Sequence, residues 1–252
     1  MNRHLSSWGK RLARTAGLSV HRARPENRFE AMSESLEMMK QRGYAPRVVI
    51  DGGANLGQWA TLASAVFPQA VFNLIEPQPR CQEHLRASLT APRFRVHPFA
   101  LTAPGVHQVR LASAGGQGVS TGAFVTDREW GADVDVLEAP ATTLDELLAD
   151  SVTAADRVLL KLDLEGHELA ALQGATTLLG IAEALVIETS FYDIFSQGRP
   201  LFAEIVAHLT RAGFVLYDFA ALYPRARDQR LRMADAILVR TGSPLLDDVS
   251  WD

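Results

Sequence analysis

The sequence predicts an α/β protein whose Rossmann-like sheet has seven mainly parallel strands and is covered by helices on both faces. Three observations indicate this architecture: short apolar segments alternate with amphipathic helical segments, most apolar segments are nearly continuous, and a glycine-rich turn follows the first of them. Strands that are apolar on both sides are typical of parallel sheets buried between helical layers. The 252 residues, 47% of them hydrophobic, suffice to bury such a core.

The elements follow one another with the expected periodicities. Phe29, Met32, Leu36 and Met39 form an apolar stripe that predicts a first helix. The predicted strands are 47–51, 71–76, 94–101, 157–163, 183–190, 213–219 and 234–240. The predicted helices between them are 58–66, 79–89, 142–150, 166–179 and 201–211, whereas 102–156 is less regular before its helical end. Thr143 and Glu146 have the spacing of a capping box. The last two strands have no helix between them, which predicts a hairpin with one antiparallel strand at the sheet edge.

Positive charge without compensating acids is concentrated at the start of the chain. Residues 1–24 contain six Lys or Arg and no acid, although the whole chain has a net charge of −4. We therefore divide the chain into a basic N-terminal extension (1–27), a single domain (28–242) and a C-terminal tail (243–252). We expect this extension to be a frayed or docked terminus; the alternatives are weak contact with an anionic membrane surface and, ranked last, an organelle transit peptide. No apolar run is long enough for a transmembrane helix. The net negative charge also argues against the extensive basic surface that nucleic-acid binding requires.

Composition also bears on the compartment. The single cysteine, Cys81, excludes an internal disulfide and fits a reducing environment. The chain has 22 Arg and 3 Lys with abundant Ala, which we interpret as a bacterial coding bias. We therefore expect a cytoplasmic bacterial protein.

The turn after the first predicted strand is the first candidate binding site. It reads DGGANLG (51–57), and ligands of doubly wound sheets bind beyond the carboxyl ends of the strands. Asn55 stands where the dinucleotide fingerprint G-x-G-x-x-G has its middle glycine, which disfavours a diphosphate. Asp51 places a carboxylate at the strand end, where it would attract an ammonium group such as that of S-adenosylmethionine. The alternative is a purely structural turn.

Glu76 is the second candidate. It ends the second predicted strand, 19 residues after Gly57, and an acid at this distance accepts hydrogen bonds from ribose hydroxyls. Adenosyl ligands and nicotinamide dinucleotides share that ribose, so Glu76 does not distinguish them. The alternative is an acid stabilised by the dipole of the following helix.

The segment KLDLEGHE (161–168) is the third candidate. Strand alternation places Lys161, Asp163 and Glu165 on one side. His167 falls in the first helical turn, where the helix dipole disfavours imidazolium, and a neutral imidazole can take a proton from a hydroxyl. The alternative assigns the glutamates to helix capping and His167 to solvent. Asp163 needs a partner, because it ends a fully apolar strand.

Together with the C-terminal segment SFYDIFSQGRPLFAEIVAHLTRAGFVLYDF…ADAILVR, these motifs resemble the FkbM-type methyltransferases over about residues 28–240. The resemblance implies the class I methyltransferase fold, S-adenosylmethionine as cofactor, and methyl transfer to a hydroxyl oxygen of a sugar or a secondary metabolite. It further implies a cofactor site made of Asp51, Gly53, Asn55, Gly57, Gln58, Glu76, Pro77, Ala100, Leu101 and Asp163.

The implied reaction needs a base that removes the proton of the acceptor hydroxyl. Our candidates are Asp163 first, His167 second and Glu188 third. Mg²⁺ prefers oxygen ligands, and Asp163, Glu165 and Glu188 would supply them, but we do not expect a required metal.

The acceptor pocket is expected between the irregular region 102–156 and the segment 191–200. We assign Glu165, Tyr192, Arg225 and Asp235 to the substrate: an aromatic ring can stack on a sugar face, and the arginine-rich loop 223–232 suits an anionic group. The alternatives are packing for the aromatic residues and a solvated hairpin for the loop. The expected partner is a small-molecule or glycan acceptor, and we allow for a homo-oligomer.

Two other functions compete with methyl transfer. One is a non-catalytic relative that only binds the cofactor or a partner. The other is a nicotinamide-dependent oxidoreductase, which Asn55 and the two consecutive final strands disfavour.

Overall fold

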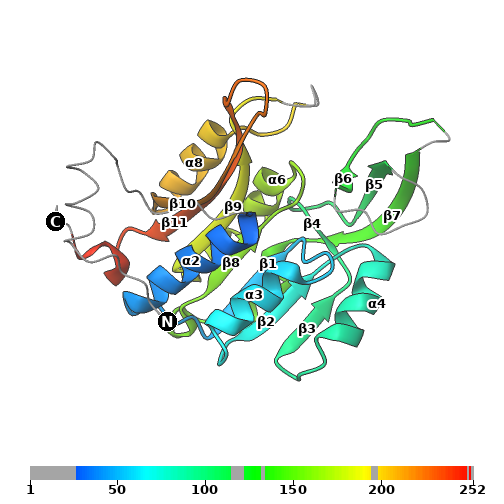
Figure 1. Ribbon diagram of the computed structural model, residues 1–252. Helices are drawn as coiled ribbons and strands as arrows, with labels where there is room; N and C mark the ends of the chain where they lie inside the picture. The colour runs from blue at the N-terminus through cyan, green and yellow to red at the C-terminus, as the bar shows by residue number, and fades with distance from the viewer. Residues whose placement is uncertain (1–26, 115–121, 132–133, 194–197, 249, 251–252) are drawn as a thin grey trace.

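A seven-stranded sheet forms the centre of the computed structural model, which describes residues 27–114, 122–131, 134–193, 198–248 and 250 (Figure 1). The sheet has the order β10-β11-β9-β8-β1-β2-β3. Its strands are β1 (Val48–Gly52), β2 (Val71–Ile75), β3 (Phe94–His97), β8 (Leu159–Leu162), β9 (Ala184–Ser190), β10 (Phe214–Pro224) and β11 (Leu231–Arg240). All neighbours from β3 to β9 pair in parallel. The predicted α/β class and the predicted number of strands are confirmed.

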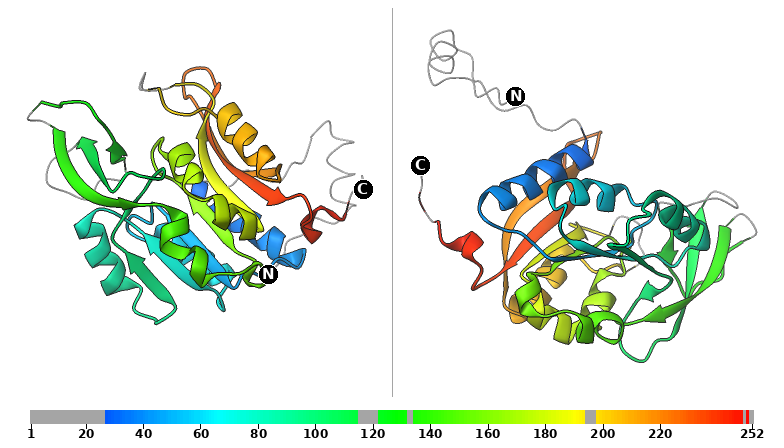
Figure 2. Two further views of the ribbon diagram at one scale, coloured as in Figure 1. Left: turned by 180° about the vertical axis from the view of Figure 1, so that it is seen from behind. Right: turned by 90° about the horizontal axis from the view of Figure 1, so that it is seen from below.

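Helices cover both faces of this sheet and enclose two cores (Figure 2). One layer comprises α2 (Arg28–Gln41), α3 (Gln58–Val66) and α4 (Pro79–Ser88), and the other comprises α5 (Leu144–Leu148), α6 (Glu168–Gln173), α7 (Thr176–Ile181) and α8 (Phe202–Arg211). Leu159 of β8 belongs to the first core and Leu160 to the second, because successive residues of a strand point to opposite faces.

The C-terminal hairpin is present, but its antiparallel strand does not lie at the edge. β11 inserts between β9 and β10 and is antiparallel to both, so the expectation of an antiparallel edge strand is wrong. Residues 234–239 of β11 are all buried, whereas burial along β10 varies from residue to residue. The more continuously buried strand therefore occupies the interior position, where it has neighbours on both sides.

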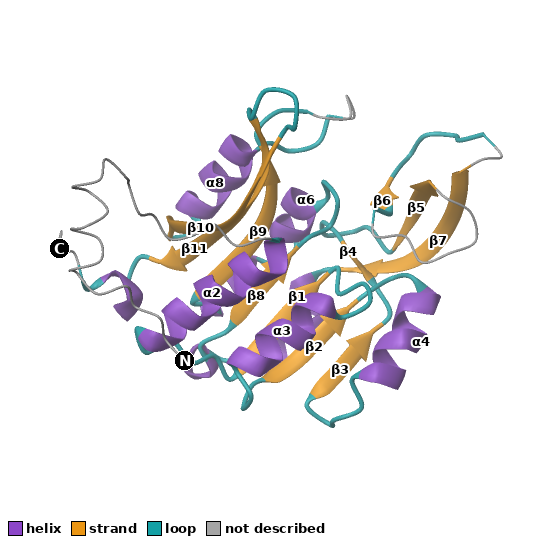
Figure 3. Cartoon of the chain, in the orientation of Figure 1, coloured by secondary structure: helices purple, strands orange, loops and turns teal. Residues whose placement is uncertain are grey.

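The region 102–156 is more regular than the sequence predicts. A second sheet beside the main one has the order β4-β7-β5-β6 (Figure 3) and consists of β4 (Ala100–Leu101), β5 (Gln108–Ala114), β6 (Phe124–Val125) and β7 (Val134–Thr142). It buries only a small cluster around Val109, Leu111 and Ala139. Val136 and Leu137 of β7 are exposed, so these strands lack the apolar pattern that marks the main sheet.

Two predicted elements are each divided in the structure. The segment 94–101 is split into β3 and β4 around Pro98, which has no backbone N–H for a sheet hydrogen bond. The segment 166–179 is split into α6 and α7 after Gln173, where Gly174 is a poor helix former. The other predicted elements are confirmed to within a few residues, except that β10 and β11 are longer, and the capping box of Thr143 and Glu146 is present.

At both predicted boundaries of the domain, 27/28 and 242/243, residues just outside the boundary interact with the domain. Asn27 caps α2 by accepting a hydrogen bond from the Glu30 N–H, and the rest of the predicted basic extension lies outside the described residues. At the other end, a short 3-10 helix (Pro244–Leu246) places Leu245 in the first core, so this part of the predicted tail packs with the domain. Among the described helices, none has both the length and the apolarity needed to cross a membrane.

Candidate active site

A cavity, called here the first cavity, lies where the carboxyl ends of β1, β2 and β8 meet. Parallel strands bring their carboxyl ends to one edge of the sheet, which is the usual ligand position in such folds. The predicted site residues that line the cavity are Gly53, Asn55, Gln58, Glu76, Pro77, Ala100, Leu101, Asp163, Glu165 and His167. The glycine turn, Glu76 and the segment 161–168, which are far apart in the chain, thus line the same cavity.

The turn after β1 lies directly against the segment after β8. Gly53 has a φ angle of +74°, and a Cβ there would lie 2.0 Å from the carbonyl oxygen of Asp163. Only glycine combines this left-handed conformation with so close an approach of two backbones. Asn55, which replaces the middle glycine of a dinucleotide fingerprint, is also left-handed, with φ of 47°, a conformation that asparagine tolerates better than most residues. The conformation of this turn is therefore fixed by its contact with the segment after β8 as well as by its left-handed residues.

Glu76 fixes the same turn from the end of β2. Its Oε2 accepts a hydrogen bond from the Asn55 N–H at 2.8 Å, and its Oε1 accepts one from the Gln78 N–H at 2.9 Å. Burial raises the pKa of Glu76, while these backbone hydrogen bonds act against that rise. The Gln78 side chain also donates a hydrogen bond to this carboxylate; because each carboxylate oxygen has two acceptor sites, these three bonds leave acceptor capacity for a ligand.

Asp51 occupies a different place from the one expected. It is fully buried and is not among the residues that line the first cavity. Its Oδ1 lies 3.0 Å from the Nζ of Lys161, which also donates hydrogen bonds to the carbonyl oxygens of Gly52 and Gly53. Burial raises the pKa of Asp51 and the lysine lowers it. Lys161 thus links the carboxylate of Asp51 to the backbone of the turn. Asp51 contributes to the site through this lysine and does not line the cavity itself.

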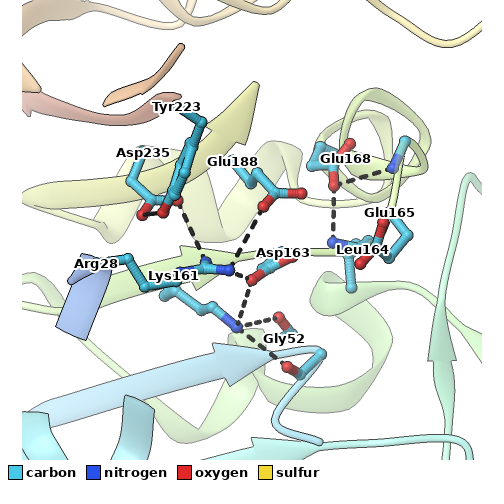
Figure 4. A network of polar contacts seen from close by, with 12 residues as sticks. Arg28, Gly52, Lys161, Asp163, Leu164, Glu165, Glu168, Glu188, Tyr223 and Asp235 are labelled. Atoms are coloured by element: carbon cyan, nitrogen blue, oxygen red, sulfur yellow. Dashed lines mark hydrogen bonds and ion pairs between the residues drawn. The ribbon is translucent and has the colours of Figure 1, made fainter. Parts of the chain in front are cut away.

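A second group of carboxylates surrounds Arg28, the first residue of α2 (Figure 4). Its Nη2 donates hydrogen bonds to Asp163 at 2.9 Å and to Asp235 at 3.5 Å, and its Nη1 lies 3.8 Å from Glu188. Burial lowers the pKa of Arg28, but the carboxylates outweigh burial and raise it above its ordinary value. The partner that Asp163 requires is therefore an arginine from 135 residues earlier in the chain.

Tyr223 of β10 completes this group. Its hydroxyl donates a hydrogen bond to Asp235 at 2.5 Å, and the guanidinium of Arg28 lies 5.4 Å from the centre of its ring. Asp235 and Glu188 are directly opposite each other on β11 and β9, so without a cation they would repel one another. Arg28 thus compensates the carboxylates of Asp235 on β11, Glu188 on β9 and Asp163 just after β8.

The segment after β8 supplies two groups that can accept protons. Burial, and secondly Asp163, raise the pKa of Glu165 to about 7, whereas burial lowers the pKa of His167. The Nε2 of His167 lies 3.2 Å from the hydroxyl oxygen of Thr102. Glu168 instead has a structural role, because its Oε1 accepts hydrogen bonds from the N–H groups of Leu164 and Gly166.

Other predicted site residues lie away from both cavities that the structure describes. Glu188 and Asp235 are buried behind Arg28, and Tyr192 and Arg225 contact one another, with the guanidinium 5.6 Å from the ring centre. The carboxylate of Asp228 also binds Arg225. Gly57 begins α3 as its N-cap residue and likewise does not line the first cavity.

Sequence reasoning assigned no site role to Arg28, Trp59 or Lys161. Lys161 could have been found, because strand alternation places it beside Asp163. Trp59 directly follows Gln58 in the turn motif. Arg28 gave no sequence signal, because only the packing of α2 against the sheet brings it to the site.

The wall of the first cavity fits S-adenosylmethionine. The indole Nε1 of Trp59 is buried and, within the described part of the chain, has no hydrogen-bond partner, although Trp59 lines the cavity. An unpaired buried donor suits an anionic acceptor such as a carboxylate. Glu76 offers acceptors for ribose hydroxyls, and Ala100 and Leu101 offer an apolar surface for a base. The donors and acceptors of this wall thus match the ends of the cofactor.

Among the residues that the structure describes, one group of carboxylates lies close enough together to hold a metal ion. In the described residues, ligand atoms of Asp163, Glu165 and Glu188 lie within 4.8 Å of one another. Arg28 already lies 2.9 Å from Asp163 and 3.8 Å from Glu188. A positive charge is therefore supplied by the chain itself.

Comparison with solved structures gives remote similarities. The chain is 13% identical to 1,6-didemethyltoxoflavin-N1-methyltransferase of Burkholderia thailandensis, crystallised with S-adenosylhomocysteine, over 86% of this chain and 79% of that chain, with a TM-score of 0.46. It is 12% identical to precorrin-6y C5,15-methyltransferase of Geobacter metallireducens (82% and 86% covered, TM-score 0.44) and to S-adenosylmethionine-bound fibrillarin of Aeropyrum pernix (82% and 76% covered, TM-score 0.43). All three TM-scores are below 0.5.

No curated protein matches the chain significantly. The model of the family described as "Methyltransferase FkbM domain", however, matches residues 51–216. This range contains the glycine turn, Glu76 and the whole segment 161–168, and it is more than half of the chain. The protein therefore belongs to the FkbM methyltransferase family and is an S-adenosylmethionine-dependent methyltransferase of α/β fold.

Proposed function

We propose that this protein transfers the methyl group of S-adenosylmethionine to a hydroxyl oxygen of a sugar or a secondary metabolite. One observation carries the proposal: the first cavity unites the residues that suit the cofactor with Glu165 and His167, two groups able to accept a proton. A hydroxyl is a weak nucleophile unless its proton is removed as it reacts. A proton acceptor beside the cofactor therefore favours oxygen methylation.

In this proposal each part of the cofactor is held by a different part of the chain. Glu76 accepts hydrogen bonds from the ribose hydroxyls, the Trp59 N–H binds the carboxylate of the methionine portion, and Ala100 and Leu101 contact the adenine. Gly53 and Asn55 provide backbone close to the methionine portion, and Asp163 attracts its ammonium group. When bound, the cofactor supplies an electrophilic methyl group, and alignment of the acceptor oxygen with it is worth up to about 7–11 kcal/mol.

Asp163 has a binding rather than a proton-accepting role in this scheme. Its Oδ2 accepts a hydrogen bond from Arg28 at 2.9 Å and lies 3.9 Å from the Nζ of Lys161. Because two cations of the chain already contact this carboxylate oxygen, we assign Asp163 to charge pairing and proton acceptance to Glu165 or His167. The variant Asp163→Asn should therefore lower cofactor affinity as well as reduce turnover at least about tenfold.

We propose that no metal is required, since Arg28 compensates the carboxylates that would bind Mg²⁺. Methyl transfer by the purified enzyme should be unchanged in the presence of EDTA and should gain nothing from added Mg²⁺. Activity that disappears with EDTA and returns with Mg²⁺ would contradict this part of the proposal.

The test of the function has a binding arm and a transfer arm. Isothermal titration should detect S-adenosylmethionine and S-adenosylhomocysteine but not NAD. Formation of S-adenosylhomocysteine should then be followed with methyl glycosides of glucose, galactose, mannose and rhamnose, with hydroxylated secondary metabolites, and with amines and thiols as comparators.

Transfer to hydroxyl acceptors alone supports the proposal, whereas transfer mainly to an amine or a thiol refutes oxygen methylation. Cofactor binding without transfer to any acceptor favours the non-catalytic alternative. Membership of a methyltransferase family leaves the nicotinamide-dependent alternative without support.

A further inference from the structure

A second cavity adjoins the first on the side of the small sheet and α6. It has a volume of about 490 Å³, within the range of small-molecule binding sites. Its walls are formed by 124–128 and Trp130, by 165–167 and one side of α6, and by Gly198, Arg199, Pro200 and Glu204 on the approach to α8 and in its first turn. Because methyl transfer needs two ligands side by side, a neighbouring cavity of this size has an evident use.

The two cavities share three lining residues, Val125, Glu165 and His167. Among the described residues, Glu165 is the only carboxylate that lines both cavities. Its neighbours are engaged elsewhere: Asp163 binds Arg28, Glu168 accepts two backbone N–H groups, and Glu188 lines neither cavity. Glu165 is thus the acid at the junction.

The backbone at the junction is held in an unusual conformation. Glu165 has a φ angle of 54°, a left-handed conformation that is unfavourable for a non-glycine residue. At the next residue, Gly166 (φ 97°), a Cβ would lie 2.4 Å from the Cδ of Arg199, whose Nη1 is 3.7 Å from Glu165 Oε2. Such strain persists where the surroundings impose it, and it is concentrated at functional sites.

The far wall of the second cavity is aromatic and polar. The rings of Phe124 and Trp130 meet edge to face, with centroids 5.7 Å apart, and the guanidinium of Arg199 lies 5.2 Å from the centre of the Phe124 ring. The Trp130 N–H donates a hydrogen bond to the hydroxyl of Thr126 at 3.1 Å. A compact acceptor with apolar C–H faces and several hydroxyls matches this wall.

From this geometry we propose that the acceptor binds in the second cavity, and that Glu165 takes the proton of its reacting hydroxyl at the junction. The inference rests on the proposed function. As the acceptor oxygen bonds to the methyl carbon, the carbon–sulfur bond of the donor breaks and its electron pair stays on sulfur. The hydroxyl proton goes to Glu165, which later releases it to solvent.

The state of Glu165 at neutral pH supports this role. Its pKa is raised to about 7 by burial and by Asp163, against the effect of Arg199, so it can both accept and release a proton under ordinary conditions. The titratable or charged groups that face it are Asp163, His167 and Glu168 on its own segment, Arg28 from α2, Glu188 from β9 and Arg199.

Three variants of the full chain test the proposal. Ala170→Phe fills the second cavity, which Ala170 lines; Ala87→Phe makes the same change on an exposed position of α4 and is the control; Glu165→Gln removes the base. Binding of S-adenosylhomocysteine is measured by titration calorimetry. Binding of the four methyl glycosides to the enzyme with S-adenosylhomocysteine is measured by saturation-transfer NMR. Turnover is measured with whichever glycoside is methylated fastest.

All three variants should bind S-adenosylhomocysteine within about twofold of the wild type. Glycoside binding should be lost in Ala170→Phe and retained in Ala87→Phe and Glu165→Gln. Turnover of Glu165→Gln should fall by about 10²–10⁴-fold, and the decline of wild-type turnover below pH 7 should be absent from its residual activity. Glu165→Asp should recover part of the rate.

Several results would overturn the inference. They are glycoside binding that survives Ala170→Phe, turnover of Glu165→Gln within threefold of the wild type, and absence of glycoside binding or transfer in a wild type that binds S-adenosylhomocysteine. Failure of the wild type to bind S-adenosylhomocysteine would instead refute the proposed function, so the two failures are distinguishable.

Discussion

Replacing Lys161 with methionine should destabilise the protein strongly, because the change leaves a buried carboxylate without its cation. Asp51 is fully buried and lies 3.0 Å from the lysine Nζ, and the carbonyl oxygens of Gly52 and Gly53 lose a donor at the same time. Breaking a buried ion pair by removing one partner costs about 3–5 kcal/mol. For a protein of this size that corresponds to a fall in Tm of about 6–20 °C.

The loss should depend on pH. Without the lysine, burial and the neighbouring carboxylate of Asp163 both act on Asp51 and raise its pKa further above the value in the unfolded chain. The folded variant then binds more protons than the unfolded chain between these two pKa values, so its free energy of unfolding decreases as the pH rises. Urea unfolding at pH 5 and pH 8, without cofactor, should therefore show the larger deficit at pH 8.

The matched control is Lys40→Met. Lys40 is exposed and donates one hydrogen bond to the carbonyl oxygen of Val66, so its loss should cost about 1 kcal/mol or less. The reasoning would be refuted if Lys161→Met lost no more than Lys40→Met, or if its deficit were the same at both pH values.

Three further predictions follow from individual contacts. Gly53→Ala should weaken S-adenosylhomocysteine binding at least about tenfold in calorimetry, because the Cβ would meet the Asp163 carbonyl; Gly43→Ala, at a similar φ of +87° with nothing within 4 Å, should cost stability but not affinity. Burial raises the pKa of Glu168 to about 7, so the folded state holds its proton above the unfolded pKa and stability falls as pH rises from 5 to 8. Glu168→Gln keeps a side-chain oxygen that accepts the backbone hydrogen bonds but cannot ionise, so the loss in free energy of unfolding between pH 5 and pH 8 should be smaller by up to about 3 kcal/mol. If urea unfolding showed the same pH dependence for the variant and the wild type, this prediction would be contradicted. Burial raises the pKa of Cys81 to about 12, so Ellman's reagent should label it at least about 100-fold faster in 6 M guanidinium than in the native protein; rapid native labelling would contradict its burial.

The sequence was informative wherever a pattern is local. The apolar strands of the main sheet, the glycine turn and the capping box of Thr143 and Glu146 each follow from neighbouring residues, and the structure contains all of them. The second sheet was missed because its strands bury too little apolar surface to leave a clear periodicity: β4 and β6 have two residues each, and the longer β7 leaves Val136 and Leu137 exposed. The position of β11 was missed because pairing between strands is decided by the whole sheet.

For the site, the sequence by itself determined the family motifs and their place at the carboxyl ends of strands, because strand ends are set by local polarity and glycines. Only the tertiary structure decided what each charged side chain meets. It turned Asp51 towards Lys161, brought Arg28 to Asp163 across 135 positions, and placed Glu165 between two cavities. A buried charge takes whichever partner the packing supplies, and packing joins residues that no sequence spacing relates.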